Sequence, residues 1–119
     1  MKGYQELNVW QKAYDLCLEI YKITNTFPVS EKYGLISQIR RSAVSIPSNI
    51  AEGHERQYLK EYVQFLYVAL GSVAELRTQI MVSKDIGYLS EKSFSKIDSG
   101  LVEIGKMLNG LINSLNKKT

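Results

Sequence analysis

Apolar residues recur at helical spacing along almost the whole chain, and no stretch alternates apolar and polar positions for more than a few residues. A half-buried strand requires such alternation, whereas a helix that packs by one face requires apolar residues three and four positions apart. Four stripes of the helical kind follow one another, with turn signals between them. The pattern therefore predicts an all-α protein of four helices.

The first two predicted helices are bounded by capping residues and prolines. The first begins near Asn8, which can cap it, and is stopped by Pro28. The second opens at Ser30 and runs to Gly53, a residue type that suits the position after a helix end. Pro47 lies inside the second helix and predicts a kink, because proline removes one backbone hydrogen bond and crowds the carbonyl four residues before it. The two apolar faces comprise Trp10, Ala13, Tyr14, Cys17, Ile20, Tyr21 and Thr24, and then Leu35, Ile39, Ala43, Ile46 and Ile50.

The last two predicted helices have the most regular spacing. One runs from about Tyr58 to Asp85 and is ended by Gly87, and the other opens at Ser90 and frays from Asn116 onward. Short loops between consecutive helices make neighbours antiparallel, so we expect an up-down-up-down four-helix bundle. The apolar stripes comprise Tyr62, Leu66, Ala69, Val73, Leu76 and Ile80, and then Phe94, Ile97, Leu101, Ile104, Leu108, Leu111 and Leu115.

Composition and charge narrow the range of functions. The chain has 119 residues, which suits one domain spanning 1–119. Its 15 Lys and Arg against 12 Asp and Glu give a net charge of +3, a mild excess that permits an acidic partner without requiring one. The longest apolar runs are far shorter than the roughly 20 residues that span a bilayer. A single cysteine and no signal peptide suit a reducing compartment, so we expect a cytoplasmic protein without a membrane partner.

Residues that carry catalytic or metal chemistry are few. The one histidine, His54, cannot supply the two Glu-x-x-His motifs of a di-iron bundle, and its place beside Gly53 predicts a solvated turn residue. Cys17 lies on an apolar face and is expected to be a small buried hydrophobe. We therefore predict no catalytic residue, no metal or other cofactor and no small-molecule substrate, and we expect that the protein is not an enzyme.

Two stripes of small and polar residues stand opposite the apolar faces. The second helix carries Arg41, Ser45, Ser48 and Glu52 on such a stripe, and the third carries Gly71, Ser72 and Glu75. A solvated face is the alternative, but exposed faces favour long Lys, Glu and Gln, whereas small residues favour close approach of another backbone. We therefore expect these stripes to lie at or beside a subunit interface.

Two arginines on these helices require acidic partners if they are buried. Arg41 is predicted to pair with Glu75, with Glu52 as the second choice, if a neighbouring helix covers its stripe. Arg77 falls among apolar positions of the third helix, where it either finds an acid or extends its stem over the core rim with its head in water. The second of these alternatives is the preferred prediction for Arg77.

The sequence resembles a known family in several motifs. Motifs over nearly the whole chain are similar to those of the helical bundle proteins that are encoded in intervening sequences of the bacterial large-subunit ribosomal RNA gene. They are Leu7-x-Val9-Trp10-x-x-Ala13, Phe27-Pro28-x-x-Glu31-x-Tyr33-Gly34-Leu35, Gln38-x-Arg40-Arg41-Ser42-Ala43-Val44-Ser45-Ile46-Pro47-Ser48-Asn49-Ile50-Ala51-Glu52-Gly53, Gly71-Ser72-x-x-Glu75-Leu76, Lys106-Met107-Leu108 and Leu111-Ile112. The resemblance implies a four-helix bundle. It also implies kinship with the accessory proteins of diversity-generating retroelements, which form homopentamers and bind nucleic acid together with a reverse transcriptase.

The resemblance leads to the first functional hypothesis, a homo-oligomer, most plausibly a pentamer, that binds RNA or DNA. A ring concentrates the small charge of each copy, so a weakly basic chain becomes a binder of polyanions. Structured RNA bound through its backbone is expected, because no basic patch interleaved with aromatic residues stands out. The residues expected to bind it are Arg40, Arg56, Lys60, Lys117 and Lys118.

Two alternatives stay open at this point. One is a scaffold that docks a partner protein, which the eight tyrosines favour because tyrosine is enriched at protein interfaces. The other is a retained mobile-element protein without a role in binding nucleic acid. Binding to a structured RNA across a salt series separates these hypotheses, because electrostatic binding weakens steeply with salt.

Overall fold

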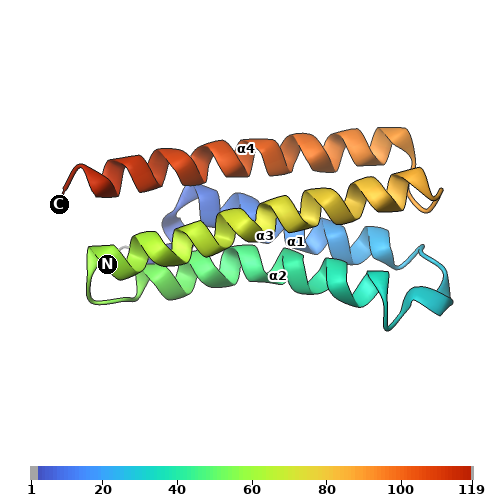
Figure 1. Ribbon diagram of the computed structural model, residues 1–119, viewed down its shortest axis with the longest axis horizontal. Helices are drawn as coiled ribbons and strands as arrows, with labels where there is room; N and C mark the ends of the chain where they lie inside the picture. Colours follow the sequence, from blue (N-terminus) through green and yellow to red (C-terminus); the bar gives the residue numbers. More distant parts are fainter. Residues whose placement is uncertain (1–2, 119) are drawn as a thin grey trace.

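The computed structural model describes residues 3–118 as an elongated bundle of four helices, with extents of 46 × 23 × 22 Å. The helices alternate in direction along the chain, so the expected up-down-up-down arrangement is confirmed (Figure 1). Each helix packs against the next, and α1 also packs against α4. The elements are η1 (Tyr4–Glu6, a 3₁₀ helix), α1 (Asn8–Thr24), η2 (Val29–Glu31, a 3₁₀ helix), α2 (Leu35–His54), α3 (Leu59–Asp85) and α4 (Glu91–Asn116).

The core is aliphatic and follows the predicted stripes closely on α2, α3 and α4. The fully buried side chains with the largest volumes are Ile20, Ile39, Ile46, Ile50, Leu66, Leu76, Ile80, Ile97, Leu101, Ile104, Leu108 and Ile112. On α1 the prediction is partly wrong, because Tyr14 and Tyr21 are 45% and 40% exposed. The buried stripe of this helix is narrow, and each tyrosine lies one position beyond a buried residue, Ala13 or Ile20, at its edge.

The predicted starts of the first two helices need correction. Leu7, not Asn8, is the N-cap residue of α1, and no side chain caps that end. Ser30 lies in η2, and α2 begins later, at Leu35. Glu31 explains this start, because one carboxylate oxygen accepts a hydrogen bond from the Leu35 backbone N–H (3.3 Å) and the other accepts one from the Tyr88 hydroxyl (3.0 Å).

Gly53 lies within α2 rather than after it, contrary to the sequence prediction. The helix continues to His54, and no positive φ occurs here. The small size of the residue is what the packing requires, because a Cβ atom at Gly53 would lie 2.7 Å from Cβ of Phe65 and 3.1 Å from Cδ1 of Tyr62. Gly53 therefore allows α3 to approach α2 closely at this end of the bundle.

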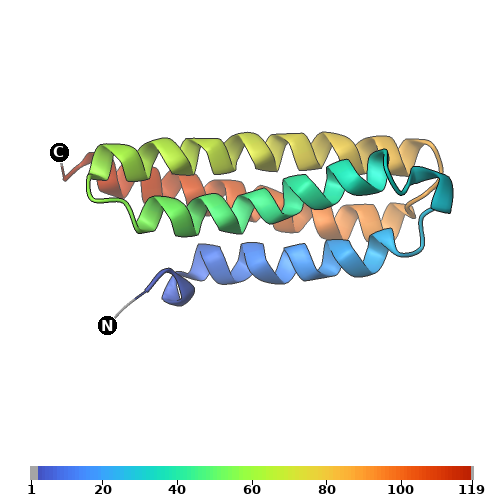
Figure 2. The same ribbon diagram turned by 90° about the horizontal axis from the view of Figure 1, so that it is seen from below.

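Pro47 does not interrupt α2. Pro47 lies within the helix and is buried in the bundle, and Figure 2 shows one continuous ribbon from Leu35 to His54. The kink at Pro47 stays a prediction.

The turn from α3 to α4 forms as the sequence predicts. Gly87 adopts a φ of +90° after α3, and the Tyr88 N–H donates to the Ser83 carbonyl (2.8 Å) while the Gly87 N–H donates to that of Lys84 (3.0 Å). This is the Schellman pattern that favours glycine. Ser90 then caps α4 by accepting a hydrogen bond from the Ser93 N–H (3.1 Å). The connections 55–58 and 86–90 are thus both short.

Candidate nucleic-acid and subunit interfaces

Four of the five basic residues predicted to bind nucleic acid lie at one end of the bundle. This is the end where α2 turns into α3 and where α4 stops, and it carries Arg56, Lys60, Lys117 and Lys118 (Figure 1). Arg56 pairs with Glu52 (Nη2 to Oε2, 3.1 Å). The three lysines are exposed, and none of them forms an ion pair with a residue in the described part of the chain. The lysine ammonium groups at this end are therefore open to a polyanion.

Arg40 lies apart from this end and spans from α2 to the end of α1. Its Nε donates to Oγ1 of Thr24 (2.9 Å), and its Nη2 donates to the Tyr21 carbonyl (3.3 Å) and to Oδ1 of Asn25 (3.0 Å). The guanidinium also lies over the Tyr21 ring, 4.7 Å from its centroid. All three acceptors are neutral, so they fix the side chain without compensating its charge.

The small-residue stripes of α2 and α3 meet each other within one chain. The hydroxyl groups of Ser45 and Ser72 are 2.8 Å apart, and Nδ2 of Asn49 donates to the Ser45 carbonyl (2.8 Å) and hydroxyl (2.9 Å). Arg41 pairs with Glu75 (Nη2 to Oε2, 3.1 Å), the partner predicted first. Their side chains are 67% and 41% exposed, so the burial on which that prediction depended is not present in the single chain. Contact between α2 and α3 thus accounts for Ser45 and Ser72.

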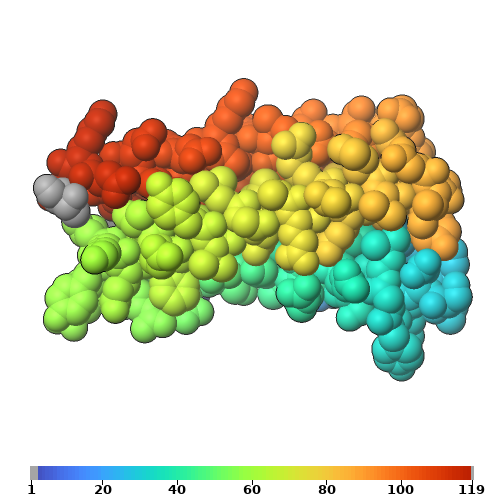
Figure 3. Space-filling view, in the orientation of Figure 1, coloured from blue at the N-terminus to red at the C-terminus, as the bar shows by residue number. Residues whose placement is uncertain are grey.

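The outward face of α3 is apolar although no described residue covers it. Besides Leu59 at its start, four large apolar side chains on this helix are exposed, and Gly71 lies among these four with no atom within 4 Å of where its Cβ would be. The four are Tyr67, Val68, Met81 and Val82. Figure 3 shows this side of the molecule, with α3 across its middle. By length and composition α3 is apolar enough to cross a membrane (mean hydropathy 1.2), but a core helix meets the same criterion, and α3 packs between α2 and α4.

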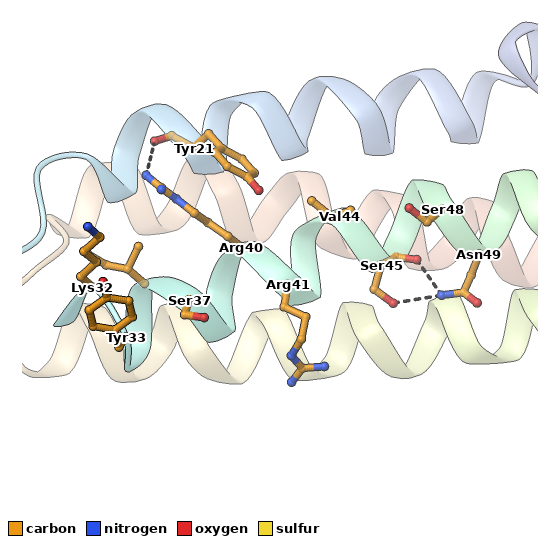
Figure 4. Close-up of a pocket in the computed structure, with 11 residues that line it drawn as sticks. Tyr21, Lys32, Tyr33, Ser37, Arg40, Arg41, Val44, Ser45, Ser48 and Asn49 are labelled. Carbon is orange, nitrogen blue, oxygen red and sulfur yellow. Dashed lines mark hydrogen bonds between the residues drawn. The ribbon is translucent and has the colours of Figure 1, made fainter.

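A shallow groove runs over the outward surface of α2 (Figure 4). Tyr33, at one end of it, is 89% exposed, and the Lys32 ammonium lies 5.4 Å from the centroid of its ring. Lys32 and Tyr33 were not predicted as site residues from the sequence, although Gly34, directly after them, is a turn signal. The groove is lined by Tyr21, Lys32, Tyr33, Ile36, Ser37, Arg40, Arg41, Val44, Ser45, Ser48 and Asn49.

His54 and Cys17, the residues considered for catalysis or metal binding, both pack against other parts of the bundle. His54 ends α2 instead of lying in the turn, and its ring meets the rings of Tyr4 and Tyr62 edge-on, with centroids 6.5 and 5.7 Å away. Cys17 is buried, and this burial raises the pKa of its thiol. Within residues 3–118, no three His, Cys, Asp or Glu side chains form a group that could hold a metal ion.

Arg77 departs from the preferred prediction. Its Nε and Nη2 donate to the two carboxylate oxygens of Asp98 on α4, at 2.8 and 3.2 Å. This hydrogen bond raises the pKa of Arg77 above its ordinary value. The arginine therefore fastens α3 to α4 instead of ending in water alone.

Comparisons with known proteins place the chain in context. A family model described as "23S rRNA-intervening sequence protein" matches residues 5–110. A crystal structure of a protein of unknown function from the S23 ribosomal protein family of Bacteroides thetaiotaomicron superposes with a TM-score of 0.82, at 24% sequence identity. The superposition covers 88% of this chain and 95% of the other, and at this identity it shows the fold. No curated protein matches the chain.

Proposed function

This chain belongs to the family of 23S rRNA-intervening sequence proteins, and from that membership we propose that it is a non-enzymatic protein that assembles into a homo-oligomeric ring and binds RNA. A pentamer is the favoured assembly, and structured RNA is the favoured ligand. Kinship with the accessory proteins of diversity-generating retroelements stays a prediction.

The apolar outward face of α3 is the observation that supports assembly into an oligomer. Exposed apolar side chains arranged along one helix mark a surface that another helix covers, because an isolated surface helix places polar residues outward. Gly71 sits at the middle of this face and leaves room for a neighbouring backbone. Glu75 also lies on α3 and pairs with Arg41 of α2. We propose that Arg41, Ser48 and Glu52 lie beside the contact between copies.

Assembly also multiplies the small positive charge of each chain. Five copies at +3 each amount to about +15, and a ring repeats the basic end of the bundle around one axis. Lysines there, such as Lys60, Lys117 and Lys118, are flexible point charges suited to phosphates rather than to base edges. The expected binding is therefore salt-dependent and directed at the backbone of RNA.

The assembly is tested by the mass in solution of a Gly71→Phe variant. We expect the wild type to be an oligomer and the variant to be a monomer with unchanged helical circular dichroism, because a Cβ at this position meets no atom of its own chain within 4 Å. Gly110→Phe is the matched control, since a Cβ there also meets nothing within 4 Å but lies on α4. Equal masses for Gly71→Phe and the wild type contradict the proposed interface.

RNA binding is tested with a fluorescent RNA hairpin titrated at several salt concentrations. We expect the affinity to fall steeply with salt, and a Lys117→Glu/Lys118→Glu variant to bind more weakly than a control with Lys92→Glu and Lys96→Glu on α4. No binding at low salt contradicts the proposal.

The exposed tyrosines favour a second candidate function, a scaffold for another protein. Tyr14, Tyr33, Tyr58 and Tyr67 are all largely exposed, and tyrosine is enriched at protein interfaces. An oligomer that binds no RNA at low salt is the result that favours the scaffold.

A further inference from the structure

We propose that the groove over α2 binds a single-stranded segment of RNA, whose phosphates contact Arg40 and Lys32 and one of whose unpaired bases stacks on Tyr33. This inference rests on the proposed function, RNA binding, and adds to it a site and a form of RNA. The basic end of the bundle, in contrast, is suited to the backbone of structured RNA.

The charge of the groove indicates an anionic ligand. Its lining includes the cations Lys32, Arg40 and Arg41 and contains no Asp or Glu. Arg41 is neutralised by Glu75, which lies outside the lining. Lys32 and Arg40 form no ion pair with any carboxylate that the structure describes, so two uncompensated positive charges face the groove.

Arg40 is held in place for such a ligand. A guanidinium has five N–H groups, and the three on Nε and Nη2 of Arg40 donate to Thr24, Tyr21 and Asn25. The two N–H groups of Nη1 have no partner among the described residues. Figure 4 shows the side chain crossing from α2 toward α1 along one edge of the groove. A fixed cation with free donors is suited to a phosphate, because little side-chain entropy is lost when it binds.

The aromatic residues indicate unpaired bases. The Tyr33 ring is 89% exposed between two ordered elements, η2 and α2, so packing does not account for it. Exposed aromatic rings beside cations are the platform on which single-stranded nucleic acids stack, whereas the bases of a duplex are already stacked on each other. Ser37 and Ser48 along the floor offer hydroxyl groups to the ribose 2′-OH.

A second copy of the chain fits this groove less well than RNA does. The proposed contact between copies is the apolar face of α3, and such a face offers no charge to compensate Lys32 and Arg40. A polyanion compensates both, so the groove stays available while α3 is covered.

The test compares two exposed tyrosines in binding to a fluorescein-labelled oligouridylate of 15 nucleotides. We expect Tyr33→Ala to weaken this binding about tenfold, because stacking of one base contributes roughly that much. Tyr14→Ala is the matched control, since Tyr14 is 45% exposed but lies on α1, outside the lining of the groove. Tyr33→Trp should restore binding, Lys32→Gln should weaken it more than Lys92→Gln, and an RNA duplex should bind Tyr33→Ala and the wild type equally.

The outcomes separate this inference from the proposed function. If the wild type binds neither the oligouridylate nor the duplex, RNA binding itself is wrong, and the groove proposal falls with it. If the wild type binds RNA and Tyr33→Ala binds the oligouridylate as tightly as Tyr14→Ala does, only the groove proposal is wrong. If Tyr33→Ala instead lowers the mass in solution, a second copy occupies the groove, which also overturns the proposal.

Discussion

Substitution of Gly53 by alanine should destabilise the bundle, although the same change inside a helix ordinarily stabilises it. Alanine is favoured over glycine in a helix interior by up to about 1 kcal/mol. At Gly53 the new Cβ would lie 2.7 Å from Cβ of Phe65 and 3.2 Å from the Tyr62 carbonyl oxygen. Neither atom is the end of a flexible side chain, so α2 and α3 must move apart.

The size of the effect follows from these two opposing contributions. Overpacking of a tight contact costs about 1–3 kcal/mol, and subtracting a propensity gain of about 1 kcal/mol leaves a net loss of up to about 2 kcal/mol. For a domain of this size the midpoint of thermal unfolding should fall by up to about 8 °C. Gly105→Ala is the control, because its Cβ meets nothing within 4 Å, and its midpoint should stay level or rise by a few degrees.

Thermal and urea unfolding, followed by circular dichroism, measure both variants at one protein concentration. A Gly53→Ala protein as stable as Gly105→Ala would refute the claim that close approach of α3 selects glycine here. A lower midpoint of thermal unfolding in both variants would show that the backbone conformation, rather than the contact with α3, requires glycine.

Three further predictions concern two ion pairs and a buried thiol. The coupling energy of Arg41 and Glu75 in a double-mutant cycle should be only about 0.2–1 kcal/mol in the monomer, because the pair is exposed; a value near 3 kcal/mol would mean that another chain covers it. Asp98→Asn should cost about 1–2 kcal/mol in urea unfolding, because two charge-assisted bonds to Arg77 weaken, and a neutral result would refute their importance. Cys17 should react with a thiol reagent only upon unfolding. Reaction of the native protein at pH 8 as fast as in urea would contradict the burial of this thiol. Because burial raises the pKa of Cys17, the thiol's contribution to stability is complete below its unfolded pKa of about 8.5 and is lost as the pH rises through its folded pKa.

Features set by neighbours in sequence were predictable. The three-four spacing on α3 and α4, the glycine at Gly87 and the cap at Ser90 all depend on interactions within a few residues, and the structure confirms them. The pairing of Arg41 with Glu75 was also predictable, because each residue lies on the stripe opposite its own helix's apolar face.

Features set by a neighbouring helix were not predictable. Gly53 was interpreted as a helix end because the residue that approaches it, Phe65, lies on another helix. Tyr21 was placed in the core because the width of the buried stripe on α1 depends on how α2 and α4 flank it. The acceptors that hold Arg40 lie 15 to 19 residues earlier in the chain, so no local pattern indicates them.

The packing of each helix against the next one in the chain also affects the order in which the protein folds and assembles. Bundles whose contacts are local in sequence fold in about microseconds to milliseconds. Two chains at micromolar concentration meet productively in about 0.1–10 s, at association rate constants of roughly 10⁵–10⁷ M⁻¹s⁻¹. If the proposed ring forms, we therefore expect each chain to exist first as a folded monomer with the outward face of α3 uncovered. Refolding should accordingly show a fast phase that is independent of protein concentration, followed by a slower phase whose rate rises with it.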